Sequence, residues 1–85
     1  MISKETMVKL ESGLHARPAA KFVQLSKRFT SKLLVSYNGK SADPKSILGL
    51  MALGAGKGSV IVITAEGEDE AQAVDALVDF VQQSE

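Results

Sequence analysis

Apolar and polar residues alternate along several short stretches of the chain, which is typical of strands that bury one face. Residues 6–10 alternate well enough to predict a first strand. Residues 33–37 and 40–42 flank the dipeptide Asn38-Gly39, which suits the two positive φ angles of a type I′ turn, and so predict a β-hairpin. The β-branched run at 60–64 predicts a further, well-buried strand.

Three other segments have the spacing of amphipathic helices. The first covers residues 16–28, where Pro18 fits the first turn and one face carries Ala19, Phe22, Val23 and Ser26. The second runs from 47 to 53, with Ser46 as its N-cap and Gly54 as its left-handed stop. The third follows an acidic start formed by Glu66, Glu68, Asp69 and Glu70, and its apolar stripe consists of Val74, Leu77, Val78 and Val81.

The predicted order is therefore β-α-β-β-α-β-α in a single domain covering residues 1–85. Strands interrupted by helices, with one tight hairpin, indicate an α+β fold in which helices cover one face of a mostly antiparallel sheet. The other face of the sheet is expected to remain open.

Composition excludes several classes of protein. The 10 Lys+Arg balance the 10 Asp+Glu, which disfavours a general nucleic-acid binder. Cysteine is absent, so we expect neither a disulfide framework nor a thiolate metal site. The charged N-terminus lacks the apolar core of a signal peptide, and no apolar run approaches the roughly 18 residues of a membrane span. We therefore expect a cytoplasmic protein with no membrane insertion.

Common enzyme templates fit the sequence poorly. The stretch at 54–59 has the glycines of a phosphate loop, but Lys57 is followed by glycine and a strand comes next, so we interpret it as a flexible connector. The acidic cluster at 66–70 lies far in sequence from the single histidine, and a solvated helix start explains it better than a metal site. No serine occupies a Gly-x-Ser-x-Gly elbow.

The single histidine, His15, is the best candidate for chemistry. It lies between Gly13 and Pro18 at a predicted helix start, with Arg17 two residues further on. A phosphoryl group on the imidazole would face the free N–H groups of the first turn and the Arg17 guanidinium, and both favour an anion. The alternative is that His15 only caps the helix.

These residues resemble a known family. The run Gly13-Leu14-His15-Ala16-Arg17-Pro18-Ala19-Ala20 is similar to the active-site signature of HPr, the histidine-containing phosphocarrier family of the bacterial sugar phosphotransferase system. The run Lys45-Ser46-Ile47-Leu48-Gly49-Leu50-Met51-Ala52-Leu53-Gly54 resembles the second signature of that family, and the likeness covers nearly the whole chain. The resemblance implies an open-faced β-sandwich, with a four-stranded antiparallel sheet covered on one face by three helices.

The resemblance also implies roles for matching residues. His15 would accept a phosphoryl group on Nδ1 from enzyme I and pass it to enzyme II A domains, while Arg17 steadies the phosphate. The chain would be a carrier without a cofactor, not an enzyme, and we expect a monomer. A regulatory branch of the family lacks this histidine, which argues against membership of that branch. Paralogues devoted to nitrogen regulation share the signature, so the pathway stays open.

Ser46 has two interpretations. An N-cap role, which stabilises the short helix by about 1 kcal/mol, is enough to explain a serine at this position. By resemblance it is also the serine that an HPr kinase/phosphorylase modifies, and a regulatory module would use the Ser46 helix to dock a catabolite-control transcription factor. Two departures bear on this role: Asp43-Pro44 precedes the motif, and Leu48 stands where we expect methionine.

The 47–53 helix has an apolar arc wider than one buried face requires. Leu50 and Leu53 can enter the core while other apolar residues stay partly exposed as a binding surface. A helix buried all round is the alternative, and the resemblance favours the docking surface. Its expected residues are Ala16, Ala20, Gln24, Lys27, Ile47, Leu48 and Met51.

Overall fold

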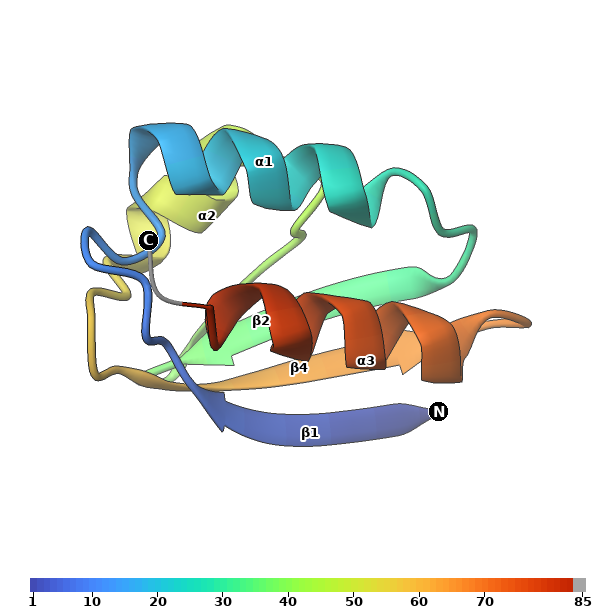
Figure 1. The fold of residues 1–85 in the computed structure, drawn as a ribbon. Helices are drawn as coiled ribbons and strands as arrows, with labels where there is room; N and C mark the ends of the chain where they lie inside the picture. Colours follow the sequence, from blue (N-terminus) through green and yellow to red (C-terminus); the bar gives the residue numbers. More distant parts are fainter. Residues whose placement is uncertain (84–85) are drawn as a thin grey trace.

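The computed structural model describes residues 1–83 as a two-layer α+β sandwich. In chain order the elements are β1 (Ile2–Met7), α1 (Ala16–Ser26), β2 (Lys32–Tyr37), β3 (Lys40–Ala42), α2 (Ile47–Leu53), β4 (Val60–Glu66) and α3 (Glu70–Val81). The strands form one antiparallel sheet in the order β1-β4-β2-β3. The helices lie together on one face of this sheet, and its other face is open (Figure 1). The predicted fold class is thus confirmed.

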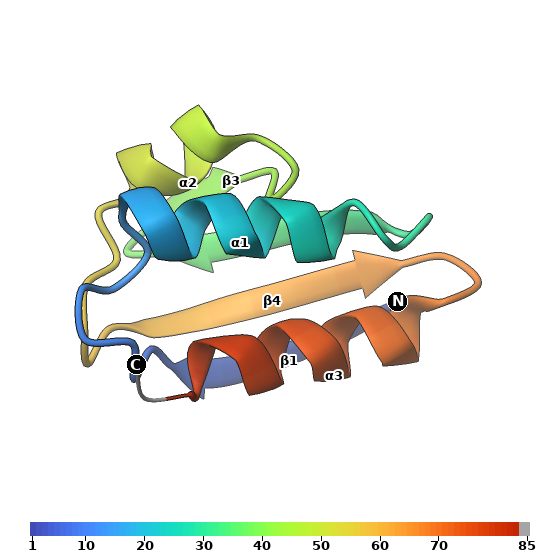
Figure 2. The ribbon, with the colours of Figure 1, turned by 45° about the horizontal axis from the view of Figure 1, so that its top comes forward.

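Different helices cover different strands of the sheet (Figure 2). The α3 helix packs on β1 and β4, α2 packs near β2 and β3, and α1 lies between α2 and α3. The hydrophobic core lies between the two layers. Its fully buried side chains include Phe22 of α1, Ile61 and Ile63 of β4, and Leu77 of α3. Phe22 also contacts Phe80 of α3, with ring centroids 5.7 Å apart.

The first strand lies earlier than predicted. It covers Ile2–Met7, whereas the alternation suggested residues 6–10. The side of β1 that faces α3 carries Lys4, which is exposed and pairs with Asp75 of α3, and the buried Thr6, which accepts a hydrogen bond from Gln82. Because these polar residues face a helix, the strand lacks the apolar alternation by which a buried face is recognised.

Two further boundaries differ from the prediction. The α1 helix ends at Ser26, not at residue 28, and the following N–H groups of Arg28 and Phe29 donate to carbonyls three residues back in a tightened turn. The β4 strand continues to Glu66, and α3 begins only at Glu70. Glu66 and Glu68 therefore precede the last helix, and Glu70 is the acidic residue of its first turn.

Candidate functional site

His15 occupies the N-cap position of α1. Its backbone is extended, with φ −109° and ψ 161°, and its carbonyl accepts the first helical hydrogen bond from the Ala19 N–H at 3.0 Å. Its side chain makes no capping hydrogen bond within the described part of the chain. The imidazole is exposed, so the structure does not use it as a helix cap.

The segment at 54–58 fixes the chain that leads to His15. The Leu14 N–H donates to the Ala55 carbonyl at 2.9 Å, and Gly58 and Ser59 exchange backbone hydrogen bonds with Val8 at 2.8 Å. Gly13 has φ +67°, and a Cβ on it would lie 2.5 Å from the Gly56 Cα. This predicted connector is thus bound by its backbone to the residue after β1 and to the loop before α1, while its flexibility stays a prediction.

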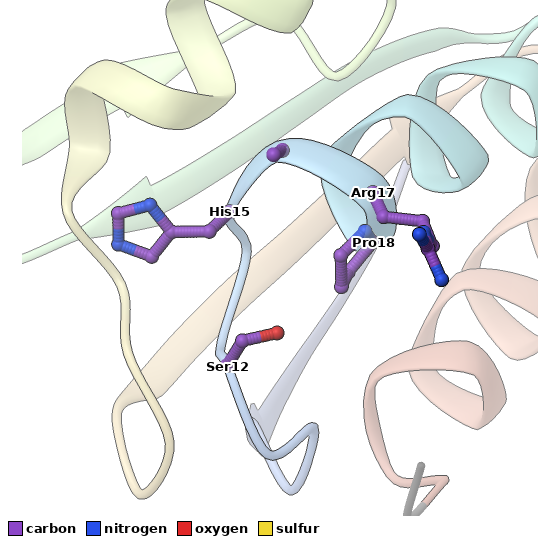
Figure 3. A pocket seen from close by; sticks show the side chains of 5 residues that line it. Ser12, His15, Arg17 and Pro18 are labelled. Carbon is purple, nitrogen blue, oxygen red and sulfur yellow. The ribbon is translucent and has the colours of Figure 1, made fainter.

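A shallow hollow of about 290 Å³ lies at the start of α1, lined by Ser12, His15, Ala16, Arg17 and Pro18 (Figure 3). The His15 ring and the Arg17 side chain extend to opposite sides of the α1 start. The backbone N–H groups of Ala16 and Arg17 belong to the first helical turn, where no preceding helical carbonyl can reach them. These donors lie at the same end of α1 as the imidazole, where an anion is favoured.

Ser46 is the N-cap of α2, as predicted. Its Oγ accepts a hydrogen bond from the Gly49 N–H at 3.3 Å, and Gly54 ends the helix with φ 71°. The preceding Asp43 accepts from the Lys45 N–H at 2.8 Å, and Pro44 is buried. Asp43-Pro44 is thus a structural turn that leads the chain into α2, while the Ser46 side chain stays exposed.

Lys45 has a structural contact that the sequence did not reveal. Its Nζ donates to the carbonyl oxygens of Phe29 at 3.1 Å and Ser31 at 3.3 Å. The segment before α2 is thereby tied to the loop that follows α1. A lysine next to a serine carries no sequence signal for such a contact, which depends on the two loops meeting in space.

The α2 helix exposes the apolar residues expected from its helical spacing. Leu50 and Leu53 are buried, whereas Ile47 is 39%, Leu48 79% and Met51 38% exposed. Of the other expected docking residues, Ala16 and Gln24 of α1 and its C-cap Lys27 are exposed, and Ala20 is partly buried. The α1 and α2 helices contact each other, so these positions belong to neighbouring elements on the helical side of the molecule.

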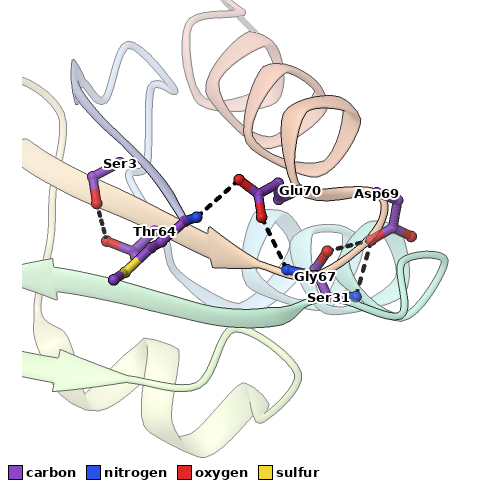
Figure 4. Close-up of polar contacts among 7 residues, drawn as sticks. Ser3, Ser31, Thr64, Gly67, Asp69 and Glu70 are labelled. Atoms are coloured by element: carbon purple, nitrogen blue, oxygen red, sulfur yellow. Dashed lines mark hydrogen bonds and ion pairs between the residues drawn. The ribbon is translucent and has the colours of Figure 1, made fainter.

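The acidic cluster at 66–70 has a structural role that the sequence did not indicate (Figure 4). The Asp69 carboxylate accepts from the N–H groups of Thr30 at 2.9 Å and Ser31 at 3.0 Å, and from the Ser31 hydroxyl. Glu70 accepts from the Gly67 N–H at 3.2 Å and pairs with the Met1 ammonium at 3.0 Å. These hydrogen bonds lower the pKa of both carboxyl groups. Glu66 and Glu68 are exposed, as a solvated helix start predicts, whereas Asp69 and Glu70 also tie this start to other segments.

The described residues contain no cluster of three or more His, Asp or Glu side chains arranged to hold a metal ion. Among residues 1–83, no helix has the length and apolar character needed to cross a membrane.

The protein is thus a small open-faced α+β sandwich. It exposes one imidazole at the start of its first helix. The family model described as the PTS HPr component phosphorylation site matches residues 2–83. The chain belongs to the HPr family.

Individual relatives come from two groups of this family. The HPr-like protein Crh of Halalkalibacterium halodurans is 49% identical over 96% of this chain and 98% of its own. The crystal structure of the phosphocarrier protein HPr from Bacillus anthracis is 46% identical, with a TM-score of 0.94 over 95% of this chain and 96% of its own. The structure of Crh from Bacillus subtilis, described as a swapped, intertwined dimer, has a TM-score of 0.77 and 44% identity over 96% of this chain and 94% of its own.

Proposed function

We propose that this chain is a phosphoryl carrier of the sugar phosphotransferase system. His15 accepts a phosphoryl group from phosphorylated enzyme I and passes it to the sugar-specific enzyme II A domains. The observation that carries the proposal is the exposed imidazole at the N-terminus of α1, whose side chain caps nothing within residues 1–83. Membership of the HPr family supports it.

The proposed chemistry requires little from the chain itself. A bond forms between a ring nitrogen of His15 and phosphorus as the bond to the donor breaks, and the ring proton leaves to solvent. The N–H groups of Ala16 and Arg17 then hold the phosphoryl oxygens. Arg17 adds its charge after its side chain turns toward the ring, from which it points away in Figure 3. The chain works in the cytoplasm as a monomer and needs no cofactor.

Partners would dock on the surface formed by α1 and α2. Ile47, Leu48 and Met51 supply apolar area, which is the part of such a surface that favours association most. Ala16, Ala20 and Gln24 extend it along α1 from the His15 end, and Lys27 lies at the other end of this helix. A surface with basic residues at its margin suits acidic partners.

A regulatory role through Ser46 is the second candidate. Its support is the exposed Ser46 hydroxyl at the start of α2, next to the exposed Ile47 and Leu48. A phosphate there would suit the helix dipole and would change the charge of the docking surface without unfolding the helix. The similarity to proteins named Crh supports this candidate, in which an HPr kinase/phosphorylase modifies Ser46 and a catabolite-control transcription factor docks.

One experiment separates the two roles. The chain is incubated with phosphoenolpyruvate and enzyme I, and its intact mass is measured before and after mild acid. The carrier role predicts an acid-labile phosphate that is absent in His15→Ala and still forms in Ser46→Ala. The regulatory role predicts an acid-stable phosphate formed with ATP and HPr kinase/phosphorylase, absent in Ser46→Ala. Failure of wild-type protein to gain the acid-labile phosphate would refute the carrier role.

A further inference from the structure

The segment at 54–58, which contacts the loop leading to His15, carries a second cation, Lys57. The backbones of 13–14 and 55–56 are in direct contact through the hydrogen bond from Leu14 to Ala55 and the close approach of Gly13 to Gly56. At one end of this contact, Lys57 Nζ pairs with Glu11 Oε1 at 3.1 Å. Both side chains are more than half exposed, 57% and 64%.

The orientation of His15 makes this ion pair relevant to the site. In Figure 3 the imidazole extends from the loop toward the side on which the segment after α2 passes, while Arg17 extends to the other side. This segment is bound to the loop before α1 through Ala55 and Gly56, and Lys57 follows Gly56 directly in the chain. Lysine has a long flexible stem and a compact charge, so it can exchange one anion for another without movement of the backbone.

Building on the proposed function, we propose that Lys57 is a phosphate-binding residue of the phosphorylated protein and that Glu11 competes for it. An exposed ion pair such as Lys57–Glu11 contributes little to stability, so its exchange costs little. A phosphoryl group offers close to two negative charges and three acceptor oxygens, against one charge on the carboxylate. Phosphorylation of His15 thus draws Lys57 away from Glu11.

This arrangement sets the lifetime of the phosphohistidine. In hydrolysis, water attacks phosphorus, the bond between phosphorus and the ring nitrogen breaks, and the ring takes up a proton as inorganic phosphate leaves. In a loose, metaphosphate-like transition state the phosphoryl oxygens lose negative charge to the leaving imidazole, so a cation that binds them more tightly in the phosphohistidine than in this transition state opposes hydrolysis. A free carboxylate near the ring favours ring protonation and has the opposite effect. The two partners of the ion pair should therefore act in opposite directions.

The test uses phosphoramidate, which phosphorylates an exposed imidazole without enzyme I, and follows loss of phosphate by intact mass and ³¹P NMR. At low ionic strength we expect Glu11→Gln to lengthen the half-life of the phosphohistidine and Lys57→Met to shorten it. Each change should be about two- to fivefold, the range of exposed charge contacts, and should shrink in high salt. The double variant should lie between the single ones.

The pair Lys4–Asp75 provides a matched control. It has the same 3.1 Å distance and similar exposure, 55% and 68%, but it joins β1 to α3. Lys4→Met and Asp75→Asn should leave the half-life unchanged. Equal half-lives in wild type, Glu11→Gln and Lys57→Met, or changes of the same sign in both, would overturn the role of Lys57. Because the label is chemical, that result is independent of whether enzyme I phosphorylates the chain.

Discussion

At the scale of single residues, Asp69 shows how position along a helix can mislead about a side chain. It stands just before α3, where an acidic residue ordinarily caps its own helix, yet it makes no side-chain cap there. Its carboxylate instead binds Thr30 and Ser31 in the loop between α1 and β2. Gly67 lies against the same loop, since a Cβ on it would approach the Ser31 Cα to 2.8 Å. One carboxylate therefore joins the two connections at this end of the sandwich.

The hydrogen bonds to Asp69 predict acid sensitivity of the fold. The Ser31 hydroxyl first, and then the Thr30 N–H, lower the pKa of Asp69 below its ordinary value of 3.8. A carboxyl group whose pKa is lower in the folded state stabilises the fold above its unfolded pKa, and this stabilisation is lost as pH falls through the folded pKa. We expect the melting temperature to fall below about pH 4 and Asp69→Asn to weaken this dependence.

Calorimetry between pH 2 and 7 measures the effect. Asp69→Asn should also melt below wild type at neutral pH, because the amide cannot accept from all the donors that surround it. Asp75→Asn removes an exposed carboxylate of the same helix and serves as the control. The pKa of Glu70 is also lowered, so part of the acid dependence should persist in both variants. If the melting temperature of Asp69→Asn fell with pH as steeply as that of wild type, the hydrogen bonds to Asp69 would not be the cause of the acid sensitivity.

At the scale of elements, the loop before α1 depends on a glycine for two separate reasons. Gly13 has φ +67°, a conformation that side chains disfavour, and it also leaves no room for a Cβ beside Ala55 and Gly56. Gly39 has φ +79° but open space around it. The two positions therefore separate the conformational cost of an alanine from the steric cost.

We expect Gly13→Ala to destabilise the protein by at least ~2 kcal/mol and Gly39→Ala by about 1 kcal/mol. Urea unfolding measures both. Because the clash lies two residues from His15, Gly13→Ala should also slow phosphorylation of His15, whereas Gly39→Ala should not. Equal destabilisation by the two substitutions would show that the contact between the 13–14 and 55–56 segments is not tight.

The sequence predicts elements well where their apolar spacing is regular and poorly where polar residues face inward. The hairpin at Asn38-Gly39 and the α2 helix between Ser46 and Gly54 agree with the structure because local geometry specifies them. The predicted position of β1 is wrong because the polar residues Lys4 and Thr6 lie on its side that faces α3. The contacts of Lys45, Asp69 and Gly13 join segments distant in sequence, so no local pattern indicates them.

The candidate site also combines features that the local sequence predicts with features that depend on contacts between distant segments. His15, Arg17 and Ser46 are recognisable from their neighbours in the chain, and the positions of His15 and Ser46 at helix N-caps follow from local signals. The direction of the Arg17 side chain and the proximity of the 54–58 segment do not. They depend on how the loop after α2 packs beside the loop before α1.

At the scale of the whole molecule, the zero net charge conceals a marked separation of charge. Between residues 12 and 42 the chain has basic residues and no acidic ones, and from residue 58 to the end it has acidic residues and no basic ones. The first stretch includes α1 and the second includes α3, and these helices lie side by side on one face of the sheet (Figure 2). The molecule therefore has a positive and a negative side, with His15 at the start of the positive helix.

This separation predicts that an acidic partner is steered to α1 rather than attracted to the molecule as a whole. The rate constant for phosphoryl transfer from enzyme I should fall as salt rises, by about tenfold or more between low and high ionic strength, because screening weakens steering. Lys21→Gln combined with Lys27→Gln should lower the rate at low salt and leave it nearly unchanged at high salt. Lys4→Gln removes a positive charge from β1 and should have little effect at either. Rapid quench-flow measurements at several salt concentrations distinguish steering to α1 from attraction by net charge. Net charge alone predicts the same change in rate for every lysine removed.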